Sequence, residues 1–212
     1  MVTPVRPNRS RSASRVLPSR PFTAAATMLL FTLALYVIEA YDVSTGLKLD
    51  DADGIVAREP DHLDGVIFAP LLHHGWDHLA SNTLPFLIFG FLAMAGGIAQ
   101  FIMVTATVWV ISGLGVWLLA PPGSVTVGAS GVIFGWLVFL LFRGFFAHSA
   151  KQILLAVVLF LLWGGVLLGV LPGQPGISWQ AHLFGALAGV LAASMVARAD
   201  RRRGAGDVAL PR

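Results

Sequence analysis

The sequence contains no cysteine and very little charge. Without cysteine the chain can form no disulfide, no thiolate metal site and no cysteine nucleophile. Only 12% of the 212 residues are charged and 56% are hydrophobic, whereas a soluble domain carries about twice that charged fraction. The pI near 10.0 is compatible with nucleic-acid binding, but the basic residues lie in tails that flank apolar runs. This pattern indicates an integral membrane protein with no nucleic-acid partner.

Six apolar runs account for most of the chain. A run of about 20 apolar residues is long enough to cross the hydrocarbon core of a bilayer. The first run could also be a cleaved signal peptide, but it is long and no A-x-A site follows it at once, so we expect a retained helix. The runs are Phe22 to Ala40, Leu79 to Ala95, Phe101 to Ala120, Ala129 to Phe142, Ile153 to Leu171 and Trp179 to Ala197.

These runs predict an all-α fold, a polytopic bundle of six transmembrane helices joined by turns. The fourth run, of about 14 residues, is too short to cross at 1.5 Å per residue. We therefore expect a short central fourth helix whose beginning is shielded from lipid by protein or water, because lipid cannot satisfy bare backbone groups.

The distribution of charge predicts the domain boundaries and the topology. Residues 1–20 are arginine-rich and are expected to form a disordered tail. Residues 21–198 form the membrane domain, and residues 199–212 form a flexible basic tail. Six spans place both termini on one side, and the arginines place that side in the cytoplasm of a cell-membrane protein. Residues 41–77 are acidic and form a long outer loop, in which the apolar patch from Val66 to Leu72 is expected to lie at the membrane interface.

Few candidates for chemistry fall within the runs or at their outer ends. They are His78 and Asn82 at the start of the second run, Ser130 in the fourth and His182 in the sixth. Measured from the cytoplasmic ends of their helices, Asn82, Ser130 and His182 lie at about 21, 20 and 24 Å, so three helices present polar groups at a similar depth. Ionisable groups at such depth are costly and are usually functional.

The residue types at this depth predict nucleophilic catalysis. A serine becomes nucleophilic when an adjacent base takes its proton, and His182 is the base at the depth of Ser130. No carboxylate lies deep in any run, so a Ser–His dyad without an orienting acid is expected, and no cofactor is needed. Phe134, one turn after Ser130, is predicted to stack on the imidazole and to stabilise its protonated form.

Two further features support this arrangement. The pairs Gly131/Gly135 and Gly185/Gly189 form flat helix faces, which predict close packing of the fourth and sixth helices and a hydrogen-bond distance between Ser130 and His182. An acyl transfer also needs donors for the developing oxyanion. We expect them from the backbone N–H of Ser130 and from the side chains of His78 and Asn82, which share one side of the second helix.

The same residues carry a family resemblance. The motifs His78-x-x-x-Asn82, Gly128-Ala129-Ser130-Gly131 and Ala181-His182-x-x-Gly185 resemble those of the rhomboid intramembrane serine proteases, over roughly Leu71 to Ala197. The resemblance implies a rhomboid-like six-helix bundle, a dyad of Ser130 and His182, and an oxyanion site of His78, Asn82 and the Ser130 backbone. It gives supporting roles to Phe134, Gly128, Gly131, Gly185 and Gly189.

The resemblance also implies substrates and a route to the site. The implied partners are the lipid bilayer and single-span membrane proteins, cut near the outer face at small residues in helix-weakening sequence. The run from Ile153 to Leu171 would be a gate. Two departures stand out: residues 41–77 lack the Trp-Arg pair of many relatives, and Phe134 stands where relatives often carry tyrosine.

Other interpretations remain open for each residue. Ser130 can simply cap a helix, His182 can bond a backbone carbonyl, and His78 with Asn82 can be a polar pair at the interface. A zinc site at His73, His74, Asp77 and His78 is disfavoured, because two of the histidines are adjacent and no H-E-x-x-H motif occurs, so no metal is expected.

Two other functional classes are possible. One is a catalytically inactive relative that binds and escorts membrane proteins, against which the intact Ser130 and His182 argue. The other is a small transporter or channel, disfavoured by the lack of an internal repeat and of charged residues along the spans. The sequence carries no signal for the oligomeric state.

Overall fold

The computed structural model describes residues 15–46 and 48–208, with side chains to residue 203. Six helical segments in this part of the chain are long and apolar enough to cross a membrane. The helices are α1 (Pro21–Thr45), α4 (Trp76–Ala93), α5 (Ile98–Leu119), α6 (Ser130–Ala147), α7 (Ala150–Trp163) and α8 (Trp179–Val208), and two 3-10 segments, η3 (Met94–Gly96) and η4 (Gly164–Val170), prolong α4 and α7. The prediction of an all-α polytopic bundle is confirmed.

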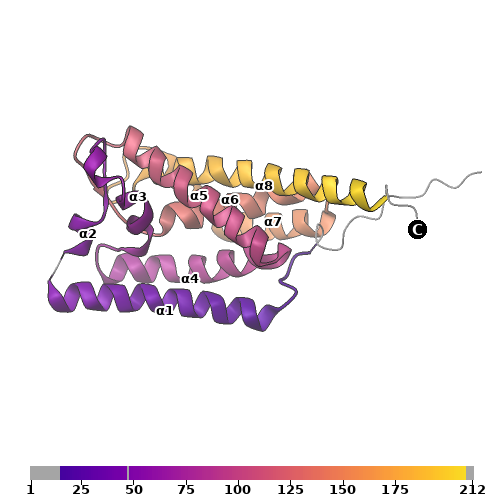
Figure 1. The fold of residues 1–212 in the computed structure, drawn as a ribbon, viewed down its shortest axis with the longest axis horizontal. Coiled ribbons are helices and arrows are strands. Elements are labelled where there is room, and N and C mark those ends of the chain that lie inside the picture. The colour runs from indigo at the N-terminus through magenta and orange to yellow at the C-terminus, as the bar shows by residue number, and fades with distance from the viewer. Residues whose placement is uncertain (1–14, 47, 209–212) are drawn as a thin grey trace, which may run out of the picture.

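The helix α6 occupies the centre of the bundle. It packs against α4, α5, α7 and α8, and it has the largest buried share of the six spans. Several of its large side chains, among them Trp136 and Phe139, are almost fully buried. Figure 1 shows that α1 begins at the end of the bundle where α8 ends, while the short elements α2 and α3 gather at the opposite end. The N-terminus of α6 therefore lies at the end where these short elements collect.

Two helices continue beyond their predicted ends. The helix α6 has 18 residues, about 27 Å, and passes Arg143, so the predicted length of 14 residues is wrong, although α6 is the shortest of the six spans. Arg143 does not end the helix because its guanidinium is buried and lies 5.3 Å from the centre of the Phe139 ring. The helix α8 continues to Val208, since the arginines and alanines after Ala197 favour helix.

This extension of α8 changes the predicted C-terminal boundary. Residues 199–208 were assigned to a flexible tail, but the backbone there is the end of a helix. The predicted tail at residues 1–20 is described only from residue 15, and residues 209–212 also lie outside the described part of the chain.

The acidic connection between α1 and α4 is folded rather than irregular. It contains α2 (Leu49–Ala52), β1 (Ile55–Val56), the 3-10 turns η1 (Pro60–His62) and η2 (Ala69–Leu71), and α3 (Gly65–Phe68). The strand β1 pairs antiparallel with β2 (Val125–Thr126), with Ile55 opposite Thr126. The indole N–H of Trp109 in α5 donates to the carbonyl of Val66 at 3.0 Å. These contacts hold the connection against the loop that leads into α6.

The glycines of α8 allow close contact with α6. A Cβ atom added to Gly185 would collide with the carbonyl oxygen of Gly131. One added to Gly189 would collide with the carbonyl oxygen of Gly135 and lie 2.9 Å from the amide nitrogen of Phe139. The two backbones therefore touch without intervening side chains, as the sequence predicted for this helix pair.

The glycines of α6 face a different helix. A Cβ atom on Gly131 would collide with the hydroxyl of Ser112, and one on Gly135 with the side chain of Val108. Both Ser112 and Val108 belong to α5. The backbones of Gly131 and Gly135 contact the glycines of α8, as the sequence predicts, while the open sides of Gly131 and Gly135 face α5. The helix α6 is therefore in close contact with both α8 and α5.

Replacing Gly189 with valine is expected to destabilise the fold by about 2–3 kcal/mol, because the new side chain must push α8 away from the backbone of α6. Denaturant titration of the purified protein in detergent micelles measures this loss. The matched control is Gly165→Val in η4, where an added Cβ meets nothing within 4 Å. Equal losses in the two variants would show that helix contact at Gly189 is not the cause.

Candidate active site

Ser130 is the first residue of α6 and does not cap it. The N-cap position is Ala129, which has no side chain able to bond the free N–H groups. The Ser130 hydroxyl makes no hydrogen bond with any residue that the structure describes. The interpretation of Ser130 as a helix cap is therefore wrong, and its hydroxyl remains available for chemistry.

Gly128 brings the loop before Ser130 against His78. Its φ angle is +119°, a backbone conformation that residues other than glycine rarely adopt. Its N–H donates to the carbonyl of Ala69 at 2.8 Å. A Cβ atom at this position would lie 2.7 Å from Cε1 and 2.9 Å from Nε2 of His78. The missing side chain is thus what lets the imidazole of His78 pack beside the serine loop.

His182 lies in the first turn of α8 and is buried. Its Nδ1 is 3.1 Å from the carbonyl oxygen of Gly169, which can only accept a hydrogen bond. In the neutral ring Nδ1 therefore carries the proton and Nε2 keeps its lone pair. The Phe134 ring stacks on the imidazole with 3.8 Å between centroids and 9° between planes. The stacking that the sequence predicted is present, and it fixes the orientation of the ring.

One cavity of about 750 Å³ collects the predicted residues. Its wall includes Ser130, His182, His78 and Asn82, together with Phe134. The helices α4, α6 and α8 thus bring together residues as far apart in the sequence as His78 and His182. No hydrogen bond joins Ser130 to His182 within the described chain, so the predicted contact is not formed in this structure. Such contacts often tighten only when substrate is bound.

Asn82 has one amide hydrogen engaged and one available. Its Nδ2 donates to the carbonyl of His78 at 3.1 Å, one turn earlier in α4. A carboxamide carries two N–H groups, so the second remains for a ligand in the cavity. His78 and Asn82 lie on the same side of α4, as their spacing predicted, and both reach the cavity wall.

His73 packs behind His78, away from solvent. It is 2% exposed, its ring lies edge-on to that of His78 at 5.0 Å, and neither of its ring nitrogens has a partner among the described residues. Burial, and then the proximity of His78 and His74, lowers the pKa of His73 from 6.5 to about 3. His73 is therefore neutral at physiological pH and acts as an uncharged support for His78.

This buried histidine predicts a loss of stability in acid. Because the pKa is lower in the folded than in the unfolded chain, the unfolded chain binds more protons. The stability that His73 gives by staying neutral is fully present above pH 6.5 and is lost as the pH falls toward 3. Between pH 7.5 and pH 5 the free energy of unfolding therefore decreases by about 2 kcal/mol. Denaturation in micelles should show a smaller decrease for His73→Phe than for wild type. The exposed His62→Phe is the control, and equal decreases in all three proteins would contradict the assignment.

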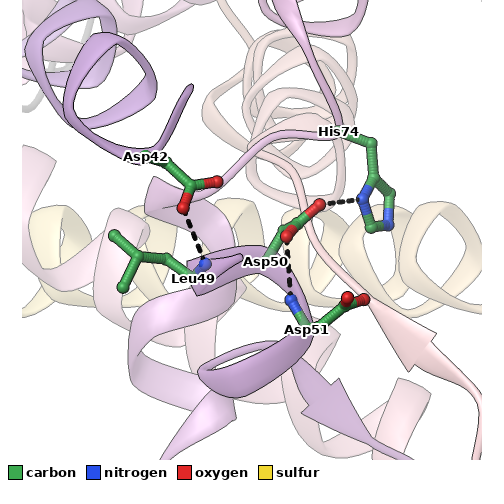
Figure 2. A network of polar contacts seen from close by, with 5 residues as sticks. All are labelled: Asp42, Leu49, Asp50, Asp51 and His74. Carbon is green, nitrogen blue, oxygen red and sulfur yellow. Dashed lines mark hydrogen bonds and ion pairs between the residues drawn. The ribbon is translucent and has the colours of Figure 1, made fainter. Parts of the chain in front are cut away.

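His74 has a partner that the sequence analysis did not foresee. Its Nδ1 lies 2.6 Å from a carboxylate oxygen of Asp50 in α2, and it also lines the cavity. Figure 2 shows this pair beside Asp42, which accepts from the N–H of Leu49 at 2.8 Å. His74 therefore connects α2 of the acidic loop to the cavity wall. The four residues considered for zinc do not converge within the described chain.

The cavity wall also contains Gln180, which the sequence analysis did not select. It precedes His182 by two positions and is 7% exposed. Its position in the sequence could have indicated it, because Gln180 is a polar residue at the beginning of the sixth apolar run and at the depth of the proposed dyad. It is not part of the three sequence motifs.

Comparison with known proteins identifies the family. The model of the rhomboid domain matches residues 60–199. An uncharacterized protein of Mycobacterium tuberculosis is 43% identical over 92% of this chain and 85% of its own length. An uncharacterized protein of Mycobacterium leprae is 44% identical over 86% of this chain and 75% of its own length. A Bacillus subtilis protein named "Putative rhomboid protease YdcA" is 31% identical over 84% of this chain and 87% of its own length.

The family match covers α4 to α7, most of α8, and all the residues that line the cavity from those helices. The sequence motifs, the six-span helical bundle and the relatives agree on one assignment. The chain is a multi-pass membrane protein and belongs to the rhomboid family of intramembrane serine proteases.

Proposed function

We propose that this protein is an intramembrane serine endopeptidase with a dyad of Ser130 and His182. One observation carries the proposal: the Ser130 hydroxyl and His182 share one cavity, and the bond from Nδ1 to Gly169 leaves Nε2 as a proton acceptor. A serine hydroxyl and a neutral imidazole in one cavity are the groups that nucleophilic acyl transfer uses.

The proposed reaction has two halves. Ser130 Oγ adds to the substrate carbonyl carbon while its proton moves to Nε2 of His182. The tetrahedral intermediate then expels the amine, which receives that proton, and leaves an acyl ester on Ser130. Water, deprotonated by His182, hydrolyses the ester and restores the serine. During the protonated stage, the face of Phe134 stabilises the imidazolium.

The proposed oxyanion site uses three groups near the start of α6. They are the backbone N–H of Ser130, the free amide hydrogen of Asn82 and the ring of His78. The first N–H groups of a helix lack helical partners, so that of Ser130 can donate to a ligand. Donors held in place before reaction stabilise the developing charge without reorganisation.

The proposed substrates are single-span membrane proteins cut near the outer face. The helix α7 with η4 has the smallest buried share of the six spans, which supports its role as the gate by which substrate reaches the cavity. We also propose that both termini are cytoplasmic, since α1 begins where α8 ends and arginines flank that end.

The test is labelling of the detergent-solubilised protein by a fluorophosphonate probe. We expect the wild type to be labelled and Ser130→Ala and His182→Ala to lose labelling by at least about 100-fold, because the probe reacts only with an activated hydroxyl. The control is Ser124→Ala, which removes a hydroxyl from the same cavity wall. A folded wild-type protein that takes up no label would contradict the proposal and favour the inactive, membrane-protein-binding relative.

A further inference from the structure

We propose that Gln180 anchors the substrate, its carboxamide hydrogen-bonding the peptide backbone of the membrane protein beside the bond that Ser130 cuts. The inference rests on the proposed endopeptidase function and adds to it a residue that recognises the extended substrate chain. It places recognition on the same turn of α8 that carries His182.

The first argument is the position and isolation of the side chain. Gln180 is 7% exposed and lines the cavity together with Ser130 and His182. Its carboxamide makes no hydrogen bond with any residue of the described chain. Its amide atoms are not enclosed by the described protein, so they face the space of the cavity, where a ligand can bind them.

The second argument is the contrast with the other polar groups of the wall. The hydroxyls of Ser81 and Ser124 donate to the carbonyls of His78 and Pro121, each at 2.7 Å. The hydroxyl of Ser178 accepts from the N–H of Ala181 at 3.3 Å. These side chains are satisfied by nearby backbone within their own helix end or loop, so their presence needs no ligand. Gln180 has no such local partner.

The third argument is the chemistry of the ligand. A substrate segment must leave the helical conformation before its carbonyl can be attacked, and this exposes backbone N–H and C=O groups within the membrane. A carboxamide offers two donors and one acceptor, the complement of a peptide group. The cavity, at about 750 Å³, is far larger than the roughly 30 Å³ that one water occupies, so it has room for several substrate residues.

The experiment compares Gln180→Met, which keeps the length of the side chain and removes its hydrogen bonds, with wild type. Cleavage of a single-span substrate in proteoliposomes gives KM and kcat, and fluorophosphonate labelling reports the reactivity of Ser130. We expect KM to rise about 10-fold, the effect of losing one or two hydrogen bonds made equally in the ground and transition states. The kcat and the labelling rate should stay within about 2-fold.

A matched control is Gln100→Met, since Gln100 lies near the start of α5, outside the cavity wall. Gln180→Glu, which keeps an acceptor and the shape, provides a second test if the methionine variant fails to fold, and it should also raise KM.

An unchanged KM would overturn the proposal. A lower kcat with accumulated acyl-enzyme would show that Gln180 holds the hydrolytic water, and slower labelling would show a structural role; either result overturns it. An unlabelled wild type would instead defeat the proposed function itself.

Discussion

Replacement of Ser130 with alanine is expected to abolish cleavage of a membrane-spanning substrate, lowering kcat/KM by at least about 1,000-fold. The reason is that Ser130 is the proposed nucleophile and shares the cavity with His182, whose ring stacks on Phe134. The fold should survive, since the Ser130 hydroxyl makes no hydrogen bond that supports the described structure. Proteoliposomes containing the variant and a single-span substrate provide the measurement, with product fragments separated on gels.

The control for this substitution is Ser178→Ala, which removes another hydroxyl from the same wall. It should retain activity within about 10-fold, because its loss weakens one bond at the start of α8. Cleavage that persisted in Ser130→Ala would rule out the dyad. Solute flux through the liposomes that was equal in wild type and Ser130→Ala would instead favour a transporter or channel.

Replacement of Gly128 with alanine is expected to lower both kcat and stability. The φ angle of +119° is unfavourable for alanine, and its Cβ would lie 2.7 Å from the His78 ring. Both the ring and the Ser130 N–H must then move, and a displacement of about 1 Å at a reacting centre can cost on the order of 100-fold in rate. We expect a loss of that size in kcat, and a loss of stability of about 1–3 kcal/mol from the strained backbone.

Gly123→Ala separates the two causes. Gly123 also has a positive φ, +73°, but a Cβ there meets nothing within 4 Å. The control should therefore show a loss of stability without a comparable loss of kcat. If Gly123→Ala lowered kcat as much as Gly128→Ala, backbone strain in the loop before α6 would explain the effect, and contact with His78 would not.

Much of the site could be predicted because a membrane restricts what a sequence can do. Strongly polar residues in a span are rare, so the sequence indicates His78, Asn82, Ser130 and His182 as candidates. Because a helix rises by a constant distance per residue, their positions in the sequence also give their depths. The stacking of Phe134 on His182 followed from the same reasoning and is present. The catalytic roles of these residues stay predictions until the variants are measured.

Other features depend on contacts between distant segments. The pair of His74 with Asp50 joins residues 24 positions apart, and the β1–β2 pairing joins the acidic loop to the turn before α6. Neither has a local sequence signal, since loop residues are not restricted to a single depth or face. The same holds for Gly131, whose open side faces Ser112 of α5 while its carbonyl oxygen faces Gly185 of α8.

The sequence by itself determined the membrane class, the six spans and the depth of the polar residues, because hydrophobicity and helix rise act locally along the chain. Only the tertiary structure decided that α6 passes Arg143, that Nδ1 of His182 bonds Gly169, and that Gln180 lines the cavity with no hydrogen-bond partner among the described residues. The physical reason is that burial and hydrogen bonding depend on which helices pack together, and an apolar run does not specify its neighbours.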